Sequence, residues 1–326
     1  MKLNPLLKLA ESLEGLPSDA TRSGYGRGVI EAGKNKQVVV LSADLTESCK
    51  VDAFQKKYPD RFFLLGVAEQ NMMGVAAGLS FTGKIPFVNS FAAFNPGRNF
   101  DQLRVSVVMS DANVKVYGGH AGVTVGEDGA THQMLVDLAL TRSLPGLIVV
   151  IPSDAEEARK ATLAIAQKEG PCYLRGGRLK VPTLTTKETP FELGKAEIFV
   201  EGTDVTIAAC GVLVYEAVLA AQELEKQGIS AEVINVHTLQ PLDSAALVNS
   251  VKKTGCIVTA EEHQINGGLG SAVGEVLSEQ HPVPLIRIGM KGFGQSGSGG
   301  ELLAESGLKA INIVKTVEKL VKKVKS

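Results

Sequence analysis

Short apolar runs alternate with amphipathic or small-residue segments along almost the whole chain. The runs are rich in β-branched residues and do not alternate apolar with polar positions, which is typical of strands buried on both faces. In the first half of the chain we predict strands at residues 38–42, 62–65, 85–88, 114–117, 147–151 and 172–174.

Helical patterns lie between these runs, at residues 24–33, 69–81, 98–110, 134–142 and 154–168. Alternation of strand and helix predicts parallel βαβ units, whose right-handed crossovers place helices on both faces of the sheet. The fold class expected from the pattern is therefore α/β, with a doubly wound and mostly parallel sheet.

The segment 176–194 interrupts the alternation, because it is rich in Lys, Thr and Pro and only weakly apolar. The alternation then resumes, with strands at 196–200, 205–209, 231–235, 256–260 and 284–288 and helices at 214–227, 244–253, 270–278 and 310–324. We predict two successive domains, residues 1–180 and 194–326, joined by a linker at 181–193.

The composition argues against several classes of function. The 326 residues carry a formal net charge of −1, so no basic surface for a nucleic acid is expected. No apolar run approaches the roughly 20 residues of a membrane span, and the first residues lack the pattern of a secretion signal. The four cysteines are scattered without CxxC spacing, which favours reduced packing residues in a cytoplasmic protein.

Polar residues gather where the predicted strands of the first domain end. In open α/β sheets, ligands bind beyond the carboxyl ends of the strands, so these loops are where a site is expected. The loops are residues 42–48, 66–71, 89–94 and 118–133.

The loop 118–133 combines His120, Asp128 and His132 with five glycines. Glycine lets a backbone approach a ligand closely, while imidazole and carboxylate groups transfer protons near neutral pH. The spacing matches no common closed zinc set, so we interpret the segment as a substrate-handling loop; a merely solvated loop is the alternative.

Glu69, Phe91 and Phe94 each allow two interpretations. A carboxylate in the first turn of a helix often only offsets the helix dipole, and Phe residues past a strand are often core. Equally, the two rings can face a flat heteroaromatic ligand. The residues after Glu69 include several glycines and alanines, a pattern that allows a second backbone to approach closely.

Taken in order, these segments resemble transketolase over nearly the whole chain, although residues 95–98 depart from the family's pattern. The resemblance rests on Ala20-Thr21-Arg22, Ser42-Ala43-Asp44-Leu45-Thr46-x-Ser48, Glu69, Phe91-Ala92-Ala93-Phe94, Asp101-Gln102-Leu103-Arg104, residues 126–133, Glu261-Glu262-His263 and Gly267-Gly268-Leu269-Gly270.

The resemblance implies a thiamine-diphosphate pyrimidine-binding fold followed by a transketolase C-terminal-like domain. It places Glu69 against the pyrimidine ring of thiamine diphosphate, where the carboxyl group sets the ring tautomer and so lets the cofactor act as its own base. Phe91 and Phe94 match the rings around that pyrimidine, and Asp44 matches an acidic residue near the thiazolium side.

Other matched positions concern the sugar. His120, Asp128 and His132 match residues that line the substrate channel and help proton transfer. Arg22, Ser48 and Arg175 match the anchors of the substrate phosphate, a role that suits guanidinium and hydroxyl groups. For Arg175 the alternative is a surface arginine after the last strand.

The Gly-Asp-Gly motif with which transketolases hold a metal diphosphate is missing from this chain. By resemblance, we expect a partner chain, the N-terminal transketolase subunit, to hold Mg²⁺ (or Ca²⁺) and the diphosphate, in an α2β2 heterotetramer active only when assembled. We expect no metal ligands in this chain itself.

The function implied is transfer of a two-carbon ketol unit between sugar phosphates, in the pentose phosphate pathway or related carbohydrate metabolism. The alternatives are the β subunit of a 2-oxo-acid dehydrogenase E1 component, a deoxyxylulose phosphate synthase, and a non-catalytic assembly partner of the same fold. The run 292–297 fits a GxGxxG pattern, but we expect a loop that leads into no helix there, and hence no dinucleotide site.

Overall fold

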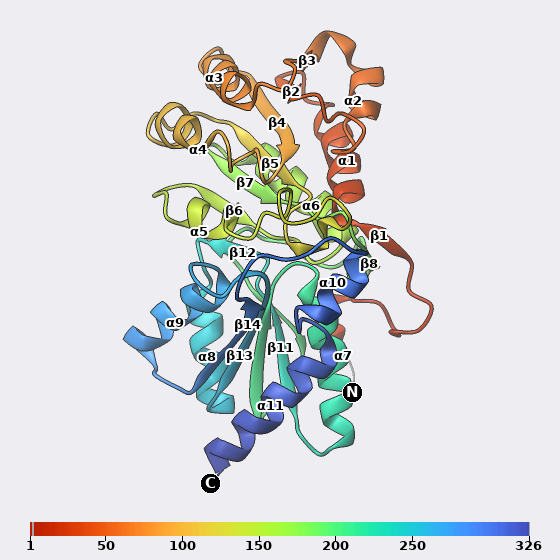
Figure 1. Ribbon diagram of the computed structural model, residues 1–326, viewed down its shortest axis with the longest axis vertical. Coiled ribbons are helices and arrows are strands. Elements are labelled where there is room, and N and C mark those ends of the chain that lie inside the picture. The colour runs from red at the N-terminus through yellow and green to blue at the C-terminus, as the bar shows by residue number, and fades with distance from the viewer. Residues whose placement is uncertain (2, 326) are drawn as a thin grey trace.

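The computed structural model describes residues 1 and 3–325, and it shows two α/β units stacked along the long axis of the molecule (Figure 1). The first unit is built on a seven-stranded sheet. Its strand order is β12 (Thr238–Gln240), β6 (Ile148–Val150), β7 (Cys172–Arg175), β5 (Lys115–Gly119), β4 (Ile85–Phe91), β2 (Val38–Ser42) and β3 (Phe62–Leu64). All neighbours pair in parallel except β12, which is antiparallel to β6.

Alternate residues of the buried strands face opposite layers of helices. Val38 and Val40 pack with α1 (Thr21–Ala32) and α6 (Ala155–Gln167), whereas Val39 and Leu41 pack with α3 (Glu69–Ser80) and the π-helical segment Leu103–Val108. The remaining helices of this unit are the short α2 (Asp52–Lys57), α4 (Phe100–Gln102) and α5 (Asp137–Arg142). The continuous apolar character of the strands follows from this double covering.

Helices α1 and α6 cross in close contact because α1 carries glycine at the crossing. A Cβ atom added to Gly24 would lie 1.8 Å from the carbonyl oxygen of Ala155, and one added to Gly28 would lie 2.6 Å from Cβ of Thr162. Any larger residue at either position would force the two helices apart.

The second unit is a five-stranded sheet. Its order is β14 (Leu285–Met290), β13 (Ile257–Gln264), β10 (Val205–Ala209), β11 (Ala231–Asn235) and β9 (Glu197–Val200), with only β9 antiparallel. Helices α7 (Leu213–Lys226) and α11 (Ala310–Lys325) cover one face, α8 (Ser244–Thr254) and α9 (Leu269–Gln280) cover the other, and α10 (Gly299–Glu305) lies towards the first unit. The predicted fold class, two mostly parallel α/β units, is confirmed.

The chain crosses between the units more often than a simple linker would require. Strand β12 comes from the second half of the sequence but extends the first sheet, with Thr238 opposite Val150. The N-terminal segment lies against the second unit, where Asn4 donates to the carbonyl of Phe199 at 2.8 Å and Leu9 joins that core. Strand β1 (Ser18–Ala20) then pairs with β8 (Lys180–Pro182) inside the predicted linker region. Strands β1, β8 and β12 were not predicted from the sequence.

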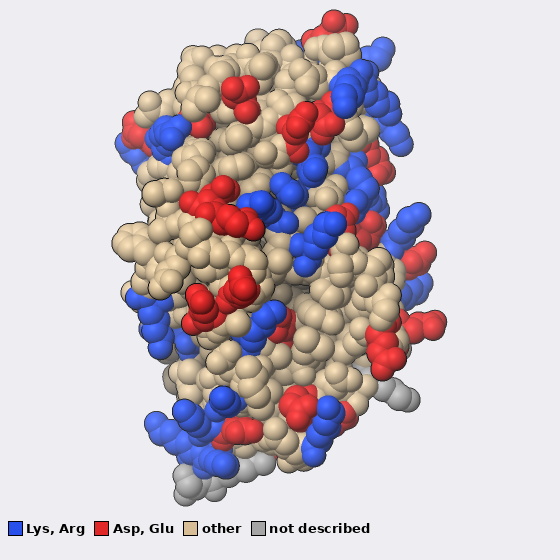
Figure 2. All heavy atoms as spheres, turned by 45° about the vertical axis from the view of Figure 1, so that its right-hand side comes forward, with Lys and Arg blue, Asp and Glu red and all other residues tan. Residues whose placement is uncertain are grey.

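One hydrophobic cluster runs through both units, since residues of β2 and β4 share it with residues of β10, α8 and α9. The two units are therefore packed as one body rather than tethered. The four cysteines are buried, as predicted for packing residues. Among the residues that the structure describes, no helix has both the length and the apolar character that crossing a membrane requires. Acidic and basic side chains are interspersed over the face in Figure 2.

Candidate active site

Glu69 opens helix α3 at the carboxyl edge of the seven-stranded sheet, and its side chain is 1% exposed. Its Oε2 lies 2.7 Å from Nη1 of Arg98, and Ser90 Oγ donates to Oε1 at 3.4 Å. The carboxylate is thus buried yet paired, which a charged group away from water requires.

The segment after strand β4 holds Glu69 in place. Ser90 belongs to β4 itself, and the turn that follows brings Asn99 to the backbone of Glu69, where its Nδ2 donates to the carbonyl at 3.1 Å. Asn99 also donates to Oδ1 of Asn95 at 3.0 Å, and Asn95 in turn donates to the carbonyl of Tyr117 at 3.0 Å. A buried amide network therefore fixes the relative positions of β4, β5 and α3.

Four rings gather beside this carboxylate. Phe91 stacks on His120 with ring centroids 3.8 Å apart, and Phe94 lies 6.2 Å from Phe91 in a nearly parallel plane. His132 meets Phe94 edge-on at 5.5 Å. Residues from two strand-end segments, 89–94 and 118–133, thus form one aromatic wall, and the guanidinium of Arg98 lies over the Phe94 ring at 4.3 Å.

His120 follows β5 in the left-handed region, with φ of 55°, and is 3% exposed. Arg22 Nη1 lies 3.1 Å from His120 Nε2. Because a guanidinium can only donate, Nε2 must be the accepting nitrogen, and the hydrogen resides on Nδ1. That Nδ1 is buried without a partner among the described residues. Burial and then the charge of Arg22 lower the pKa of His120 to about 3, so the ring is neutral near pH 7.

Arg22 connects two more predicted residues to this group. Its Nη1 also donates to the carbonyl of Ser48 at 3.3 Å, which places Ser48 next to the His120 side chain. Asp44 lies two residues past β2, exposed and with φ of 61°. Arg22, Ser48 and Asp44 therefore share the carboxyl edge with Glu69, as expected for strand-end loops.

Asp128 is exposed on the loop that follows His120, and its charged neighbour is Arg178. Arg178 Nη1 lies 3.7 Å from Asp128 and 3.1 Å from Glu127, and it donates to the carbonyl of Val125 at 2.7 Å. A pocket of about 310 Å³ is lined by Arg178, Lys180 and this loop. Sequence reasoning missed Arg178; its place three residues after Arg175 on the same strand-end loop is the signal that was available.

Arg175 requires a correction. The structure places it in the interior, 6% exposed, with Nε donating to Asp137 at 2.8 Å and Nη2 donating to the carbonyl of Glu262 at 2.9 Å. A guanidinium committed to a buried ion pair and to the second unit is not available to a substrate phosphate. Arg175 instead joins the two units, and it is not the surface arginine of the alternative interpretation either.

The second unit holds the substrate-handling loop from outside. Glu262, 3% exposed, accepts from the backbone N–H of Thr124 at 2.5 Å, and a Cβ added to Gly122 would lie 2.2 Å from its carboxyl carbon. Gln133 donates to the carbonyl of Gln295 at 2.8 Å. These contacts fix a glycine-rich loop whose backbone alone would not choose one conformation.

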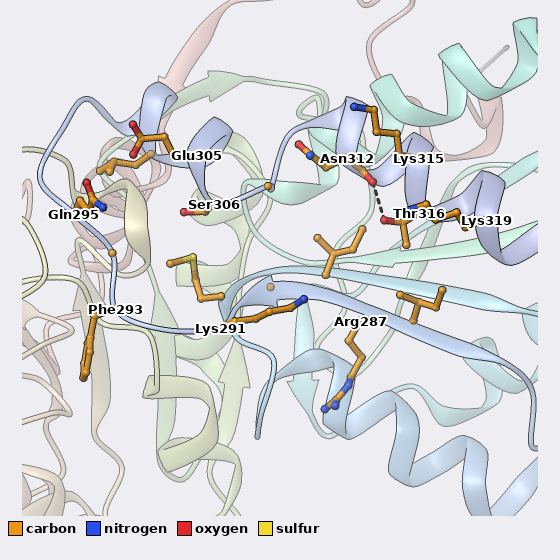
Figure 3. A pocket seen from close by; sticks show the side chains of 17 residues that line it. Arg287, Lys291, Phe293, Gln295, Glu305, Ser306, Asn312, Lys315, Thr316 and Lys319 are labelled. Carbon is orange, nitrogen blue, oxygen red and sulfur yellow. Dashed lines mark hydrogen bonds between the residues drawn. The ribbon is translucent and has the colours of Figure 1, made fainter.

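The GxGxxG run also differs from expectation, because α10 begins at Gly299, directly after it, with Ser298 and Glu301 forming a capping box. The run does lead into a helix, but its backbone packs on the substrate-handling loop. Beside it lies a pocket of about 590 Å³ (Figure 3), whose charged lining includes Arg287, Lys291, Lys315 and Lys319.

Apolar residues remain exposed on β3 and α3, next to Glu69. We call this the α3 surface: Leu64, Val67, Gly74, Val75, Gly78 and Phe81, with Val67 70% and Phe81 65% exposed. A Cβ at Gly74 or Gly78 would meet nothing within 4 Å, so the small-residue side of α3 is open. Large exposed apolar areas of this kind mark sites where another protein binds.

Two models of known families together match most of the chain. Residues 20–183 match the family described as "Transketolase, pyrimidine binding domain" and residues 194–313 match "Transketolase, C-terminal domain". A protein of Methanocaldococcus jannaschii described as a putative transketolase C-terminal section is 42% identical over 98% of this chain and all of its own length. A 6-deoxy-6-sulfo-D-fructose transketolase subunit of Clostridium sp. MSTE9 is 44% identical over 89% of this chain and 90% of its own.

A solved structure described as a split gene transketolase, inactive β4 tetramer, superposes with a TM-score of 0.86 at 45% identity, covering 94% of this chain and 99% of that one. The fold and the matched domains thus define a two-unit α/β protein of the thiamine-diphosphate class. Within that class the chain belongs to the transketolase family, and it corresponds to the C-terminal subunit of the split form.

Proposed function

We propose that this chain is the catalytic C-terminal subunit of a thiamine-diphosphate-dependent transketolase, which transfers a two-carbon ketol unit between sugar phosphates after assembly with an N-terminal subunit. The observation that carries the proposal is the buried carboxylate of Glu69 beside the aromatic wall of Phe91 and Phe94.

The residues present suit an aminopyrimidine ring. Glu69 offers a carboxylate oxygen to a ring nitrogen, and Phe94 is only half-buried, which leaves part of its ring for contact with a ligand. The Nδ1–H of His120, which has no partner among the described residues, is a buried donor available to a bound molecule. Thiamine diphosphate, when bound, supplies the electron sink that lets a ketose break a carbon–carbon bond.

We assign separate roles in the proposed reaction to residues of this chain. Glu69 holds the proton that sets the tautomer of the pyrimidine ring. His120 is neutral, so it acts as an uncharged hydrogen-bond donor through Nδ1. His132 and Asp128 face the same loop cluster and handle substrate hydroxyls. Arg22, Ser48 and Arg178 supply the donors that a phosphate dianion needs, with Arg178 in place of Arg175.

The diphosphate and its Mg²⁺ are assigned to the partner subunit. Among the described residues, the single group with metal-ligand spacing contains Glu157, Glu197 and His237, none of which lies at the strand-end loops of this site. The α3 surface is the face on which the partner would dock, in an α2β2 assembly. That the solved relative is described as an inactive β4 tetramer of a split-gene transketolase supports this requirement.

The relative from Clostridium acts, by its description, on a sulfonated sugar, so the sugar pair of this enzyme is not fixed by family membership. The four buried cysteines, which lack CxxC spacing, support a reducing compartment, and we place the enzyme in the cytoplasm.

Reconstitution tests the proposal. The chain is mixed with the N-terminal subunit, thiamine diphosphate and Mg²⁺, and ketol transfer is followed with a panel of ketose and aldose phosphates. We expect turnover only in the full mixture, and a 10²- to 10⁴-fold loss in Glu69→Gln, which keeps the shape but not the charge. Turnover in the Glu69→Gln assembly equal to wild type would refute the role of Glu69.

A further inference from the structure

A second buried polar cluster lies where the two units meet, apart from the candidate active site. Glu157 comes from α6 of the first unit, whereas Glu197 on β9 and His237 just past β11 come from the second. One carboxylate oxygen of each glutamate and a ring nitrogen of His237 all lie within 4.8 Å of one another. Their side chains are at most 8% exposed.

Glu157 is already oriented by neighbours. The backbone N–H of Ser153 donates to Oε2 at 2.5 Å, and Asn235 Nδ2 donates to Oε1 at 2.7 Å. Each oxygen keeps a further lone pair, so the carboxylate can still bind one more group. Held carboxylates of this kind are typical of ligand sets with a supporting outer shell.

His237 is oriented in the same way. Its Nδ1 lies 2.9 Å from Thr238 Oγ1, and its ring stacks on Phe191 with centroids 4.4 Å apart. The other nitrogen, Nε2, is buried and has no partner among the described residues. Glu197 Oε2 is likewise buried and unpartnered. Two orphaned atoms at one buried point indicate a missing ligand, because such atoms are costly to leave unpaired.

Negatively charged side chains outnumber positively charged ones around the cluster. Asp154, 1% exposed, accepts from the backbone N–H groups of Leu184 and Thr185 and adds a third carboxylate. The nearby cation, Lys160, donates to the carbonyls of Thr186 and Thr189.

We infer that Glu157, Glu197 and His237 form a binding site for a divalent transition-metal cation of the Zn²⁺ or Mn²⁺ class. An imidazole nitrogen favours these ions over Mg²⁺ and Ca²⁺, which prefer oxygen ligands alone. Two donors on one ion with bonds of about 2.0–2.2 Å lie at most about 4.4 Å apart. That limit is close to the 4.8 Å within which the three donor atoms lie. Two charges of the cation would offset the excess negative charge.

The cation would fasten the two units together. Its ligands come from α6 on one side and from β9 and the β11–β12 connection on the other. The residue after His237 begins β12, the strand that the second unit adds to the first sheet. Occupancy would therefore stabilise the relative placement of the units that also fixes the substrate-handling loop.

Metal binding by the full chain tests this inference without reference to activity, and so independently of the proposed transketolase reaction. The chain is stripped with a chelator, equilibrated with Mn²⁺ or Zn²⁺ in the absence of thiamine diphosphate, and analysed by elemental mass spectrometry. We expect one equivalent per chain in wild type and at least tenfold weaker binding in Glu197→Gln and His237→Gln. His281→Gln, which alters a histidine at the end of α9, is the matched control and should bind like wild type.

Pulsed electron paramagnetic resonance of the Mn²⁺ form supplies a second measurement. A ¹⁴N coupling from one imidazole is expected in wild type and in His281→Gln, even if the cluster variants fail to fold. The inference is overturned if wild type binds no equivalent, if the bound Mn²⁺ shows no ¹⁴N coupling, or if folded Glu197→Gln and His237→Gln bind as tightly as wild type.

Discussion

Arg98 places its Nη1 2.7 Å from Oε2 of Glu69 while its guanidinium covers the ring of Phe94 at 4.3 Å. The carboxylate is 1% exposed, whereas the arginine side chain is 47% exposed. One half-exposed arginine thus connects the proposed proton-handling group to the proposed aromatic wall, and it screens a charge that would otherwise be buried with only Ser90 as a partner.

Removing Arg98 should therefore destabilise the fold. We expect Arg98→Ala to lower the free energy of unfolding by about 1–3 kcal/mol, because the Glu69 carboxylate then keeps a single hydrogen bond. Urea denaturation of wild type, Arg98→Ala, Glu69→Gln and the double variant measures the coupling between the two residues.

Arg104→Ala is the matched control, since Arg104 forms a 2.7 Å pair with Asp101 in which both side chains are exposed. That pair should contribute at most about 1 kcal/mol. If Arg98→Ala and Arg104→Ala lowered the free energy of unfolding equally, burial of Glu69 would not contribute to the effect of Arg98.

The two arginines of the β7 loop should behave differently. Arg178→Ala should raise KM for phosphorylated sugars roughly ten- to a hundredfold more than for free sugars, because a charge-assisted hydrogen bond contributes about 1.5–3 kcal/mol. Steady-state kinetics of the reconstituted enzyme measures the difference.

Arg175→Ala should act on stability instead. It removes the ion-pair partner of the buried Asp137 carboxylate, which keeps the hydrogen bond from the Tyr173 hydroxyl, and such a change costs about 3–5 kcal/mol. The variant should show no preference for phosphorylated substrates. A selective KM effect in Arg175→Ala with normal stability would restore the original phosphate assignment.

The depressed pKa of His120 predicts an acid-sensitive stability. In the unfolded chain His120 takes up a proton below pH 6.5, but in the folded chain it stays neutral until about pH 3. The contribution of His120 to the free energy of unfolding is thus complete above pH 6.5 and declines as the pH falls. Between pH 7 and pH 5 the free energy of unfolding should fall by about 2 kcal/mol because of this residue.

Denaturation at both pH values, in wild type and His120→Gln, isolates this contribution. His237, whose pKa is also lowered, is present in both proteins and cancels in the comparison. A loss between pH 7 and pH 5 that is the same in both proteins would mean that His120 is protonated in the folded state.

The α3 surface should control assembly. Val67→Glu or Val75→Glu should weaken association with the N-terminal subunit by at least tenfold, because a charge would be buried without a partner. Size-exclusion chromatography and titration calorimetry measure the association. Ile311→Glu, which alters a residue 54% exposed on α11 of the other unit, should assemble normally. Normal assembly of both α3 variants would place the partner elsewhere.

The buried strands could be predicted closely from the sequence. Residues 38–42, 205–209 and 231–235 form strands with the predicted bounds, because strands covered on both faces leave a continuous apolar run. Strand β9 was predicted as a strand, but nothing in its local sequence indicates that it runs antiparallel to its neighbour. The predicted helix at 98–110 became a short helix followed by the π-helical segment, since packing rather than propensity sets its winding.

The loops of the site could also be predicted, because parallel strands bring their carboxyl ends to one edge whatever the details of packing. The sequence by itself therefore determined that there are two α/β units, and the edge where Glu69, Phe91 and His120 gather. Those properties follow from periodicity and from residue types, which are local.

Only the tertiary structure decided which of two nearby arginines is buried, which half of the chain supplies β12, and that Glu157 meets Glu197 and His237. Each of these depends on contacts between residues far apart in the chain, and the apolar or polar character of a residue does not specify its distant partner. The same holds for Arg98 and Glu69, 29 residues apart: their pairing exists because a buried amide network aligns two strand ends.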